Sequence, residues 1–169
     1  MIVYEGSRIK KKVPMREEGL LEGRKSSKYI LRVIKKQGSY FFPISTVLKG
    51  KKRKIVAKMT VDEFTPKLYR LFKIYVDTNF RNKGYGTILM NKFVDFLEER
   101  NATATLVAKP FEEDGKELAR KEFIERRKGL IRWYSNFGFK LLKPYTEKQL
   151  NHSDMSIHMI RRPEKQSNS

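Results

Sequence analysis

The chain has 169 residues, of which 39% are hydrophobic and 12% aromatic, and it contains no cysteine. This length suits one domain with a sizeable core, and the lack of thiols excludes disulfide scaffolds, cysteine-ligated zinc and thiol nucleophiles. The sequence has two histidines and no apolar run near the roughly 20 residues of a membrane span. Basic residues fill the N-terminal stretch where a signal peptide needs its apolar segment, so we expect a cytoplasmic protein with no membrane contact and no metal.

The charge of the chain is strongly positive. Lysine and arginine total 38 against 19 acidic residues, a net charge of +19. The excess is greatest in residues 1–67, which hold 18 basic and 6 acidic residues. Such a field attracts polyanions and repels cationic small molecules. It indicates either contact with a nucleic acid or another acidic macromolecule through the basic N-terminal third, or a solvated lysine-rich surface.

The first half of the chain has the apolar pattern of β-strands. Residues 1–26 are polar, and at most a short helix at 15–21 is expected there. Gln37–Gly38 and Lys49–Gly50 are typical of turns. Pro43 indicates that the second predicted strand is an edge strand or contains a bulge. The first three predicted strands are 29–36, 40–48 and 53–61.

A fourth strand is predicted at 68–77, and it is apolar on both faces, as a central strand requires. Strict alternation divides its apolar residues between the two faces, with Phe72, Ile74 and Val76 on one and Tyr69, Leu71 and Tyr75 on the other.

The second half of the chain is mainly helical. Apolar residues recur at helical spacing from Thr87 to Arg100, with Asn101 as the stop. The charged stretch 112–136 predicts a helix that Gly129 breaks in two. Three short strands are predicted at 103–108, 139–142 and 156–161. We therefore expect one domain at 1–162 and a disordered tail at 163–169.

A glycine-rich turn connects the fourth strand to the first long helix. Gly84 and Gly86 permit a tight turn and a close approach of a ligand. The free N–H groups near 82–87 point outward together at a helix N-terminus, where Arg81 and Lys83 add positive charge. The turn is therefore a candidate phosphate site, although it lacks the third glycine of the dinucleotide motif and the Gly-Lys-Ser/Thr of a P-loop.

Arg81-x-x-Gly84-x-Gly86 resembles motif A of the GNAT superfamily of acetyl-CoA-dependent N-acyltransferases. Downstream, the run from Trp133 to Phe139 resembles motif B of that superfamily, an aromatic pair followed by Gly-Phe. The order of strands and helices across about residues 53–162 agrees as well. The resemblance implies an α+β fold with a mixed, mostly antiparallel, splayed central sheet and helices on both faces.

The resemblance also implies a mechanism, direct attack of an amine on the thioester of acetyl-CoA without a metal. Tyr134 is the general acid that it implies for the leaving thiolate. The general base is not specified: Asp62, Glu63 and Asp77, near strand ends, are the candidates, and the alternative is a water ordered by Tyr75. Backbone groups near Ile74, Tyr75 and Val76 are implied to pair with the pantetheine arm. The residues implied to hold the pyrophosphate are Arg81, Asn82, Lys83, Gly84, Tyr85, Gly86 and Thr87.

Two departures from the superfamily bear on the site. Lys109–Pro110 stands where an asparagine is common, and the two helices that normally follow the first strand and form a wall of the acceptor site are missing. Either residues 1–26 replace that wall or the acceptor site is open. The acceptor that the resemblance implies is a primary amine, and an open site in a basic protein suits an amine carried on a macromolecule.

A rival hypothesis is a basic nucleic-acid-binding or regulatory protein that keeps the same fold without catalysis. Aromatic residues are interleaved with the basic residues of the N-terminal third, and they are candidates to contact RNA or DNA. Their strand-like spacing is, however, more typical of a hydrophobic core. These residues are Tyr29, Tyr40, Phe41 and Phe42.

Overall fold

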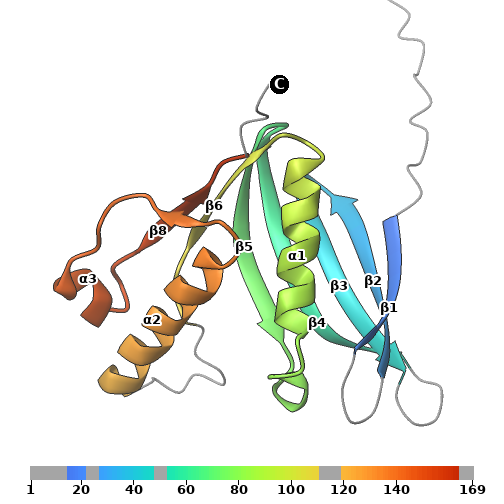
Figure 1. Cartoon of the computed structure of the whole chain (residues 1–169), viewed down its shortest axis with the longest axis horizontal. Helices are drawn as coiled ribbons and strands as arrows, with labels where there is room; N and C mark the ends of the chain where they lie inside the picture. The colour runs from blue at the N-terminus through green and yellow to red at the C-terminus, as the bar shows by residue number, and fades with distance from the viewer. Residues whose placement is uncertain (1–14, 22–26, 48–52, 111–118, 164–169) are drawn as a thin grey trace, which may run out of the picture.

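The computed structural model describes residues 15–21, 27–47, 53–110 and 119–163, which form an eight-stranded sheet with helices packed against it (Figure 1). The strand order is β1-β2-β3-β4-β5-β6-β8-β7, and every neighbouring pair is antiparallel except β5 and β6. The strands are β1 (Met15–Leu21), β2 (Ser27–Lys36), β3 (Ser39–Val47), β4 (Arg53–Thr65), β5 (Leu68–Val76), β6 (Thr103–Val107), β7 (Lys140–Leu141) and β8 (His158–Arg161). The helices are the short 3-10 helix η1 (Thr78–Phe80), α1 (Tyr85–Glu98), α2 (Arg120–Ser135) and α3 (Glu147–Asn151).

The predicted α+β class and the splayed mixed sheet are confirmed. The splay lies between β5 and β6, which pair only from Leu68↔Thr103 to Leu71↔Leu106. Beyond Leu71, β5 continues to Val76 without a strand partner on that side. The two strands therefore separate, and the sheet opens into the V seen in Figure 1.

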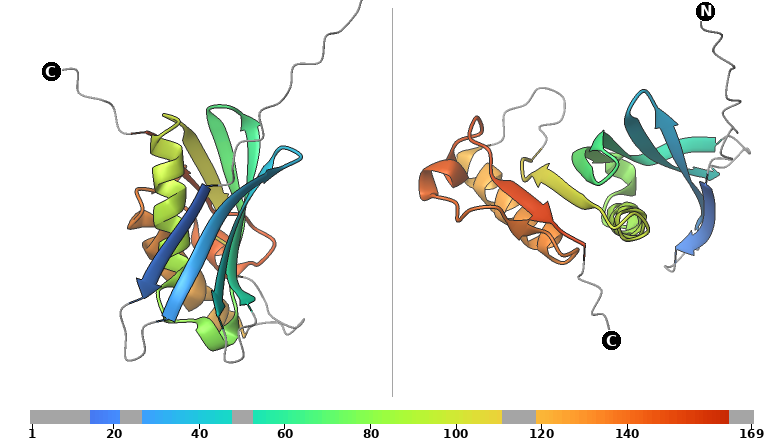
Figure 2. Two further views of the ribbon diagram at one scale, coloured as in Figure 1. Left: turned by 90° about the vertical axis from the view of Figure 1, so that its right-hand side faces the viewer. Right: turned by 90° about the horizontal axis from the view of Figure 1, so that it is seen from above.

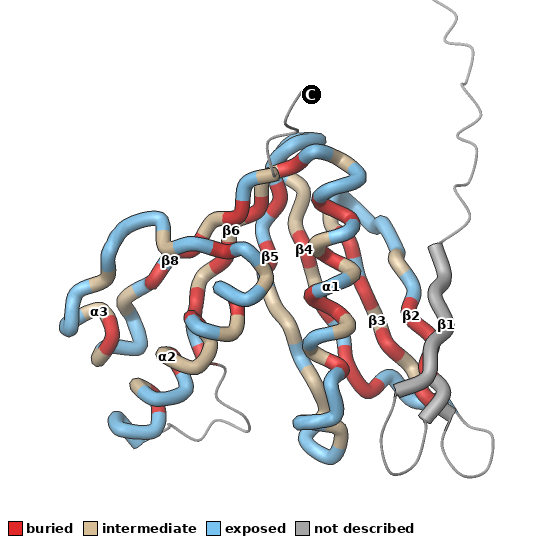
Figure 3. Tube along the Cα trace, viewed as in Figure 1, coloured by how far each residue is buried: buried red, intermediate tan, exposed pale blue. Residues whose placement is uncertain are grey.

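Helix α1 packs on β3, β4 and β5 and carries most of the core of this half (Figure 3). The Phe96 ring lies 4.8 Å from Tyr40, 5.6 Å from Phe42 and 5.2 Å from Tyr69, all edge-on. Tyr29, Tyr40 and Phe42 are thus core residues, as their spacing indicated, and Phe41 is the exposed member of that predicted group. Such aromatic contacts contribute about 0.5–1.5 kcal/mol each beyond their buried area.

The strand predictions were wrong at the N-terminal segment. Met15–Leu21 is strand β1, not a short helix, and it pairs antiparallel with β2 from Met15↔Val33 to Leu21↔Ser27. Pairing with a neighbouring strand is a tertiary interaction, which overrides a weak local preference. The predicted turn at Gln37–Gly38 is confirmed, with φ values of 47° and 77°, whereas the predicted Lys49–Gly50 turn lies outside the described residues.

Pro43 does not mark an edge strand, because β3 lies between β2 and β4. A register shift occurs nearby, where Ile44 pairs with Ala57 and Ser45 with Ile55, so the extra residue is Val56 on β4 and the bulge is not in the strand that contains Pro43, as the alternative prediction had it. No described residue between the start of β2 and the end of β3 forms a helix, so the wall that the superfamily builds there is replaced by a β-hairpin.

A second bulge changes the face assignment of β5. Leu71 pairs with Val61 and Lys73 pairs with Thr60, so Phe72 is an extra residue with no partner on β4. Beyond it, Ile74 pairs with Met59 on the α1 side, where Val76 also lies. The strictly alternating assignment was therefore wrong: Tyr69, Leu71, Ile74 and Val76 share the α1 side, whereas Phe72 and Tyr75 are exposed on the other.

The helices begin and end close to their predicted positions, with one correction. Helix α1 begins at Tyr85 rather than Thr87, and Asn101, at a φ of 47°, follows its end as expected. Helix α2 continues through Gly129 without a break. Glycine costs a helix about 1 kcal/mol, which buried side chains at helical spacing on α2 offset. Those side chains are Phe123, Arg127, Ile131 and Tyr134.

Helix α3 was not predicted, although its sequence signal exists. The Thr146 hydroxyl accepts from the Gln149 backbone N–H at 3.2 Å, and the Gln149 side chain accepts from the Thr146 backbone N–H at 2.9 Å. This is the capping box that Thr-x-x-Gln encodes. The proposed tail beyond Pro163 and the first part of the 112–136 stretch lie outside the described residues, and the domain boundaries stay predictions.

Candidate functional site

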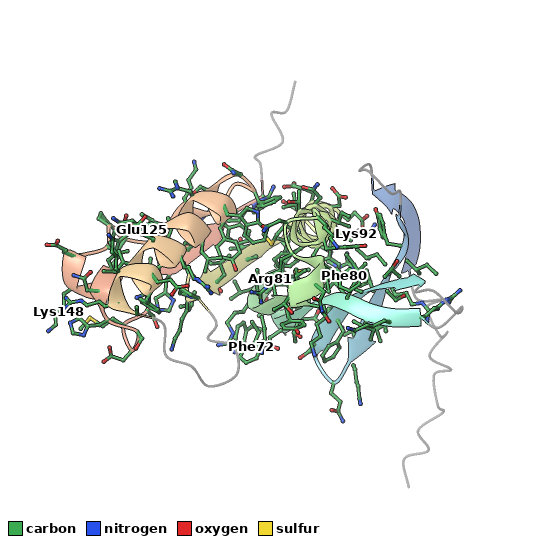
Figure 4. The ribbon with its side chains drawn as sticks, turned by 90° about the horizontal axis from the view of Figure 1, so that it is seen from below. Phe72, Phe80, Arg81, Lys92, Glu125 and Lys148 are labelled. Atoms are coloured by element: carbon green, nitrogen blue, oxygen red, sulfur yellow. The ribbon has the colours of Figure 1, made fainter. Side chains whose placement is uncertain are left out.

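A pocket of about 710 Å³ fills the mouth of the V, between the end of β5, the glycine turn and α2. This volume is typical of a site for a drug-sized or cofactor-sized ligand. Figure 4 looks into the open end of the V, where Arg81 and Phe80 lie. The lining residues are Lys73, Ile74, Tyr75, Val76, Thr78, Phe80, Arg81, Asn82, Gly84, Tyr85, Gly86, Thr87, Pro110, Arg126, Leu130, Trp133 and Tyr134.

The glycine turn presents its main-chain donors to this pocket. Asn82 and Gly84 adopt left-handed φ values of 55° and 81°, and Gly84 caps α1. Ile88 N–H bonds to Gly84 O at 3.0 Å, whereas no hydrogen bond described in the structure is donated by the N–H groups of 82–87. Alternating left-handed residues and an uncapped helix N-terminus form a concave anion site. The turn is open, and it lies beside a splayed pair of strands.

The charge of the pocket lining is positive. Its ionic residues are Lys73, Arg81 and Arg126, and no carboxylate belongs to the lining that the structure describes. Arg81 Nε donates to the Val76 carbonyl at 3.3 Å, which holds the side chain across the turn. Arg126 pairs with Glu122 one helical turn away at 2.7 Å. Arginine pairs well with phosphate oxygens, so the lining suits an anionic ligand.

The end of β5 forms the opposite wall of the pocket. Ile74, Tyr75 and Val76 all line it, in the part of β5 that has separated from β6. Main-chain groups on this side of β5 have no strand to pair with, so an extended ligand with amide groups can hydrogen-bond there as an added strand does. The bulge at Phe72 begins at the point where the pairing with β6 stops.

Tyr134 projects into the pocket from α2. Its side chain is 6% exposed, and its ring contacts Trp133 at 5.0 Å and Phe139 at 6.2 Å. Burial raises the pKa of Tyr134 to about 12, because desolvation disfavours the phenolate. No hydrogen bond of the Tyr134 hydroxyl is described. The hydroxyl is also not among the buried polar atoms that lack a partner, since Arg161 Nη1 is the one such atom in the described chain. The phenol is therefore neutral at pH 7, with its hydroxyl open to the pocket.

The position of α2 depends on a fully buried arginine. The Arg127 guanidinium donates to the carbonyls of Ala108, Gln149 and His152 at 3.0, 2.6 and 2.8 Å, and also to that of Met155. It thus ties α2 to the end of β6 and to the segment after α3. Burial lowers the pKa of Arg127. A cation that donates four hydrogen bonds to main-chain carbonyls is here a structural element.

The glycine turn and α2 come into close contact at Gly86. A Cβ added at Gly86 would lie 3.3 Å from Trp133 Cζ2, a tight contact that requires the indole to shift by a few tenths of an ångström. The close packing of Trp133 therefore favours glycine at this position.

We expect Gly86→Ala to weaken acetyl-CoA binding about tenfold, because the displaced indole distorts the pocket. Isothermal titration calorimetry measures the change. Gly129→Ala on α2 is the matched control, since an added Cβ there meets no atom within 4 Å. The control should bind normally and gain about 0.5–1 kcal/mol of stability from helix propensity. Equal binding by both variants would contradict the role given to Gly86.

The structure brings the predicted residues together with one exception. Tyr134 and all the predicted cofactor contacts line the pocket apart from Lys83. The Lys83 ammonium instead donates to the Asn79 carbonyl at 2.8 Å and lies over the Phe80 ring. The roles of these residues stay predictions.

The three carboxylates that were candidates for the general base lie outside the pocket. Asp62 and Glu63 pair with the start of β5, at the opposite end of the strand from the pocket. Asp77 accepts from Lys54 at 2.7 Å, and this hydrogen bond is the main reason that the pKa of Asp77 is lowered. Tyr75, the alternative that would order a water, lines the pocket.

The sequence reasoning missed the α2 wall beyond Tyr134. Arg126 and Leu130 line the pocket together with it. Positions 126, 130 and 134 are spaced by four residues and therefore share one helix face. That spacing was the available signal, and the predicted break at Gly129 hid it.

Two further features of the described chain bear on its chemistry. None of the described helices is long and apolar enough to cross a membrane. Within the described residues, no group of three or more His, Cys, Asp or Glu side chains is placed to hold a metal ion.

Comparison with known proteins finds the same fold in solved structures of acetyltransferases. The ribosomal-protein-S18-alanine N-acetyltransferase of Escherichia coli is 19% identical, with 80% of this chain and 76% of that chain covered and a TM-score of 0.52. A GNAT family acetyltransferase from Elizabethkingia anophelis with acetyl-CoA bound is 11% identical, with 74% and 76% covered and a TM-score of 0.49. A search of curated proteins found no match. The family model for "Acetyltransferase (GNAT) family" matches residues 17–123, more than half of the sequence. The chain therefore belongs to the GNAT family of acetyltransferases.

Proposed function

We propose that this protein transfers an acetyl group from acetyl-CoA to a primary amine. The observation that carries the proposal is the set of unused main-chain N–H groups at 82–87, which open into a pocket shared with Tyr134. A helix N-terminus with adjacent arginine suits the pyrophosphate, and the free side of β5 suits the pantetheine amides. Family membership supports acetyl-CoA as the donor.

The proposed reaction is a direct displacement. The amine nitrogen attacks the thioester carbonyl carbon, a C–N bond forms, the C–S bond breaks, and the thiolate takes a proton. Tyr134 is the proposed donor of that proton, since its phenol is neutral and faces the pocket. Tyr75, exposed at the pocket rim, is the proposed residue that orders a water to receive the proton of the amine.

The proposed acceptor is an amine carried on a macromolecule. The lining of the pocket is cationic, and the net charge of +19 repels free polyamines. A protein N-terminus or a lysine side chain presents a single amine, with flanking groups that offset this repulsion. The hairpin of β2 and β3 in place of a helical wall leaves room for a bulky acceptor.

The proposed donor is tested by heating the full chain with acetyl-CoA. A ligand at 100 times its Kd stabilises the folded state by about 2.7 kcal/mol, which should raise the Tm by several degrees. A thiol-release assay with peptides that carry a free N-terminus, peptides that carry a lysine, and spermidine then ranks acceptors. An unchanged Tm at millimolar acetyl-CoA would contradict acetyl-CoA as the donor. Preferential turnover of spermidine would contradict a macromolecular acceptor.

A further inference from the structure

The face of the sheet opposite α1 carries an exposed aromatic and basic surface. No described helix covers this side of β3, β4 and β5, as the left view in Figure 2 shows. Strand pairing places Ile34, Phe41, Thr60 and Lys73 in one row across it, and Lys58 and Tyr75 side by side in the next. We call this surface the open face and define it by Ile34, Phe41, Ile55, Lys58, Phe64, Arg70, Phe72, Lys73 and Tyr75.

The exposure of these apolar residues is unusually high for the interior strands of a sheet. Phe64 and Phe72 are 57% and 59% exposed, and Phe41 and Tyr75 are 37% exposed. Several exposed aromatic residues gathered on one face are usually an interaction site in a protein that otherwise buries its aromatics. Figure 4 shows Phe72 projecting on the side of the sheet away from α1.

Positive side chains lie among these rings. Lys58 Nζ lies 5.8 Å from the Tyr75 ring centre, and the Arg70 guanidinium lies 5.2 Å from Phe64 and 5.7 Å from Phe72. The nearby carboxylate of Asp62 is engaged by Arg70 at 3.0 Å. The open face therefore combines flat rings with cations a few ångströms away, which matches a ligand that alternates flat groups with negative charges.

We propose that the open face binds single-stranded nucleic acid, with bases stacked on its rings and phosphates beside its lysines and arginine. Exposed aromatics on a sheet stack bases in other single-strand binders, and basic side chains follow the backbone. A duplex hides its base faces, so it does not fit. Lys73 and Tyr75 also line the pocket, so a bound strand lies along the rim of the pocket.

A protein partner fits the open face less well. β3 pairs with β2 and β4, and β4 pairs with β3 and β5, so an extended peptide cannot join either strand by edge pairing. The free side of β5 beyond Leu71 faces the pocket. A helix in a groove requires a concave apolar channel, whereas the pocket described in the structure lies in the V and shares only Lys73 and Tyr75 with this face. Charge complementarity alone would also permit an acidic peptide, which the experiment below separates.

The test is fluorescence anisotropy of the full chain with a labelled 12-nucleotide oligouridylate at several salt concentrations. We expect micromolar binding in 50 mM salt, with log K falling linearly with log salt. Phe41→Ala and Phe72→Ala should each weaken binding about tenfold without changing the salt slope. Lys58→Gln should weaken it and reduce the slope by about 0.7. These three residues lie outside the pocket lining.

Matched controls lie at the far end of the molecule. Leu142, 51% exposed after β7, and Lys148, on α3, should be replaceable by alanine and glutamine with no change in oligonucleotide binding. The Tm shift with acetyl-CoA reports whether each variant is folded, and it tests the proposed enzyme function separately. Photocrosslinking of a 4-thiouridine oligonucleotide to the unmodified chain, mapped by mass spectrometry, needs no variant and should label Phe41, Phe72 or Tyr75.

Four outcomes would overturn the proposal. The first is no binding in 50 mM salt, and the second is equal affinity of the aromatic variants and the controls, which would mean diffuse attraction to a basic chain. The third is equal competition by a duplex or by polyglutamate. The fourth is binding only after removal of residues 1–14, which would make that segment of the chain the occupant of the open face.

Discussion

Replacing Tyr134 with phenylalanine is expected to lower kcat for acetyl transfer about 10²- to 10³-fold and to change the Kd of acetyl-CoA less than twofold. A positioned general acid contributes rate enhancements of this size. The substitution removes only the hydroxyl, and the ring keeps its contacts with Trp133 and Phe139. Steady-state kinetics and calorimetry on the same preparation measure the two quantities.

Tyr145→Phe is the matched control, because Tyr145 packs half-buried against the same core without lining the pocket. It should leave kcat unchanged. Equal kcat values for Tyr134→Phe and the unmodified protein would remove the proton-donor role and leave Tyr134 as a packing residue. A comparable fall in both variants would indicate general damage to the fold.

The pH dependence tests the same residue from another direction. Because burial raises the pKa of Tyr134 to about 12, its phenol should stay protonated up to about pH 11, and it should cause no loss of kcat between pH 8 and 10. The unfolded phenol has a pKa near 10. Below pH 10 the phenol is neutral in the folded and the unfolded protein, so the free energy of unfolding does not depend on it there. Between pH 10 and 12 the unfolded state alone loses the proton, so the free energy of unfolding falls as the pH rises. A kcat decline near pH 10 that disappears in Tyr134→Phe would contradict the raised pKa.

Replacing Arg127 with methionine is expected to destabilise the protein by about 3–5 kcal/mol. The four carbonyls that Arg127 satisfies lie near the end of β6 and around α3, and the substitution leaves them without their donor. Each buried group left unsatisfied costs about 1–3 kcal/mol. Urea denaturation followed by circular dichroism measures the change.

Lys128 is the matched control for Arg127, because it is the next residue on α2 and makes only a 3.5 Å pair with Glu125. Lys128→Ala should change the free energy of unfolding by less than about 0.5 kcal/mol. A loss below 1 kcal/mol for Arg127→Met would show that water replaces the guanidinium at these carbonyls, and that α2 is held by its apolar side chains alone.

Local patterns predicted the part of the fold that depends on periodicity. The alternation in β2 to β6 and the helical stripe from Ile88 to Leu97 placed these elements within a few residues. The start of α1 was misplaced: the left-handed Gly84 caps the helix, which begins at Tyr85, two residues before the predicted Thr87. The strand at Met15–Leu21 has no comparable pattern, because it is specified by its partner β2.

Part of the candidate site could likewise be predicted from local sequence, and part could not. The glycine turn and the aromatic pair at Trp133–Tyr134 were identified from sequence because tight turns and phosphate contacts need particular residue types at fixed spacing. The bulge at Phe72, the four carbonyls around Arg127 and the contact of Gly86 with Trp133 were not. Each involves residues far apart in the chain, and no local spacing encodes them.

The amino-acid sequence by itself thus determined the order of most strands and helices, the family resemblance and most residues of the glycine turn that line the pocket, since backbone sterics and hydrophobic periodicity act over a few neighbours. Only the tertiary structure decided that β5 leaves β6 after Leu71, that the bulge turns Phe72 and Tyr75 away from α1, and that the three carboxylate candidates for the general base lie outside the pocket. These outcomes depend on the register between strands, and register is chosen by packing over the whole sheet.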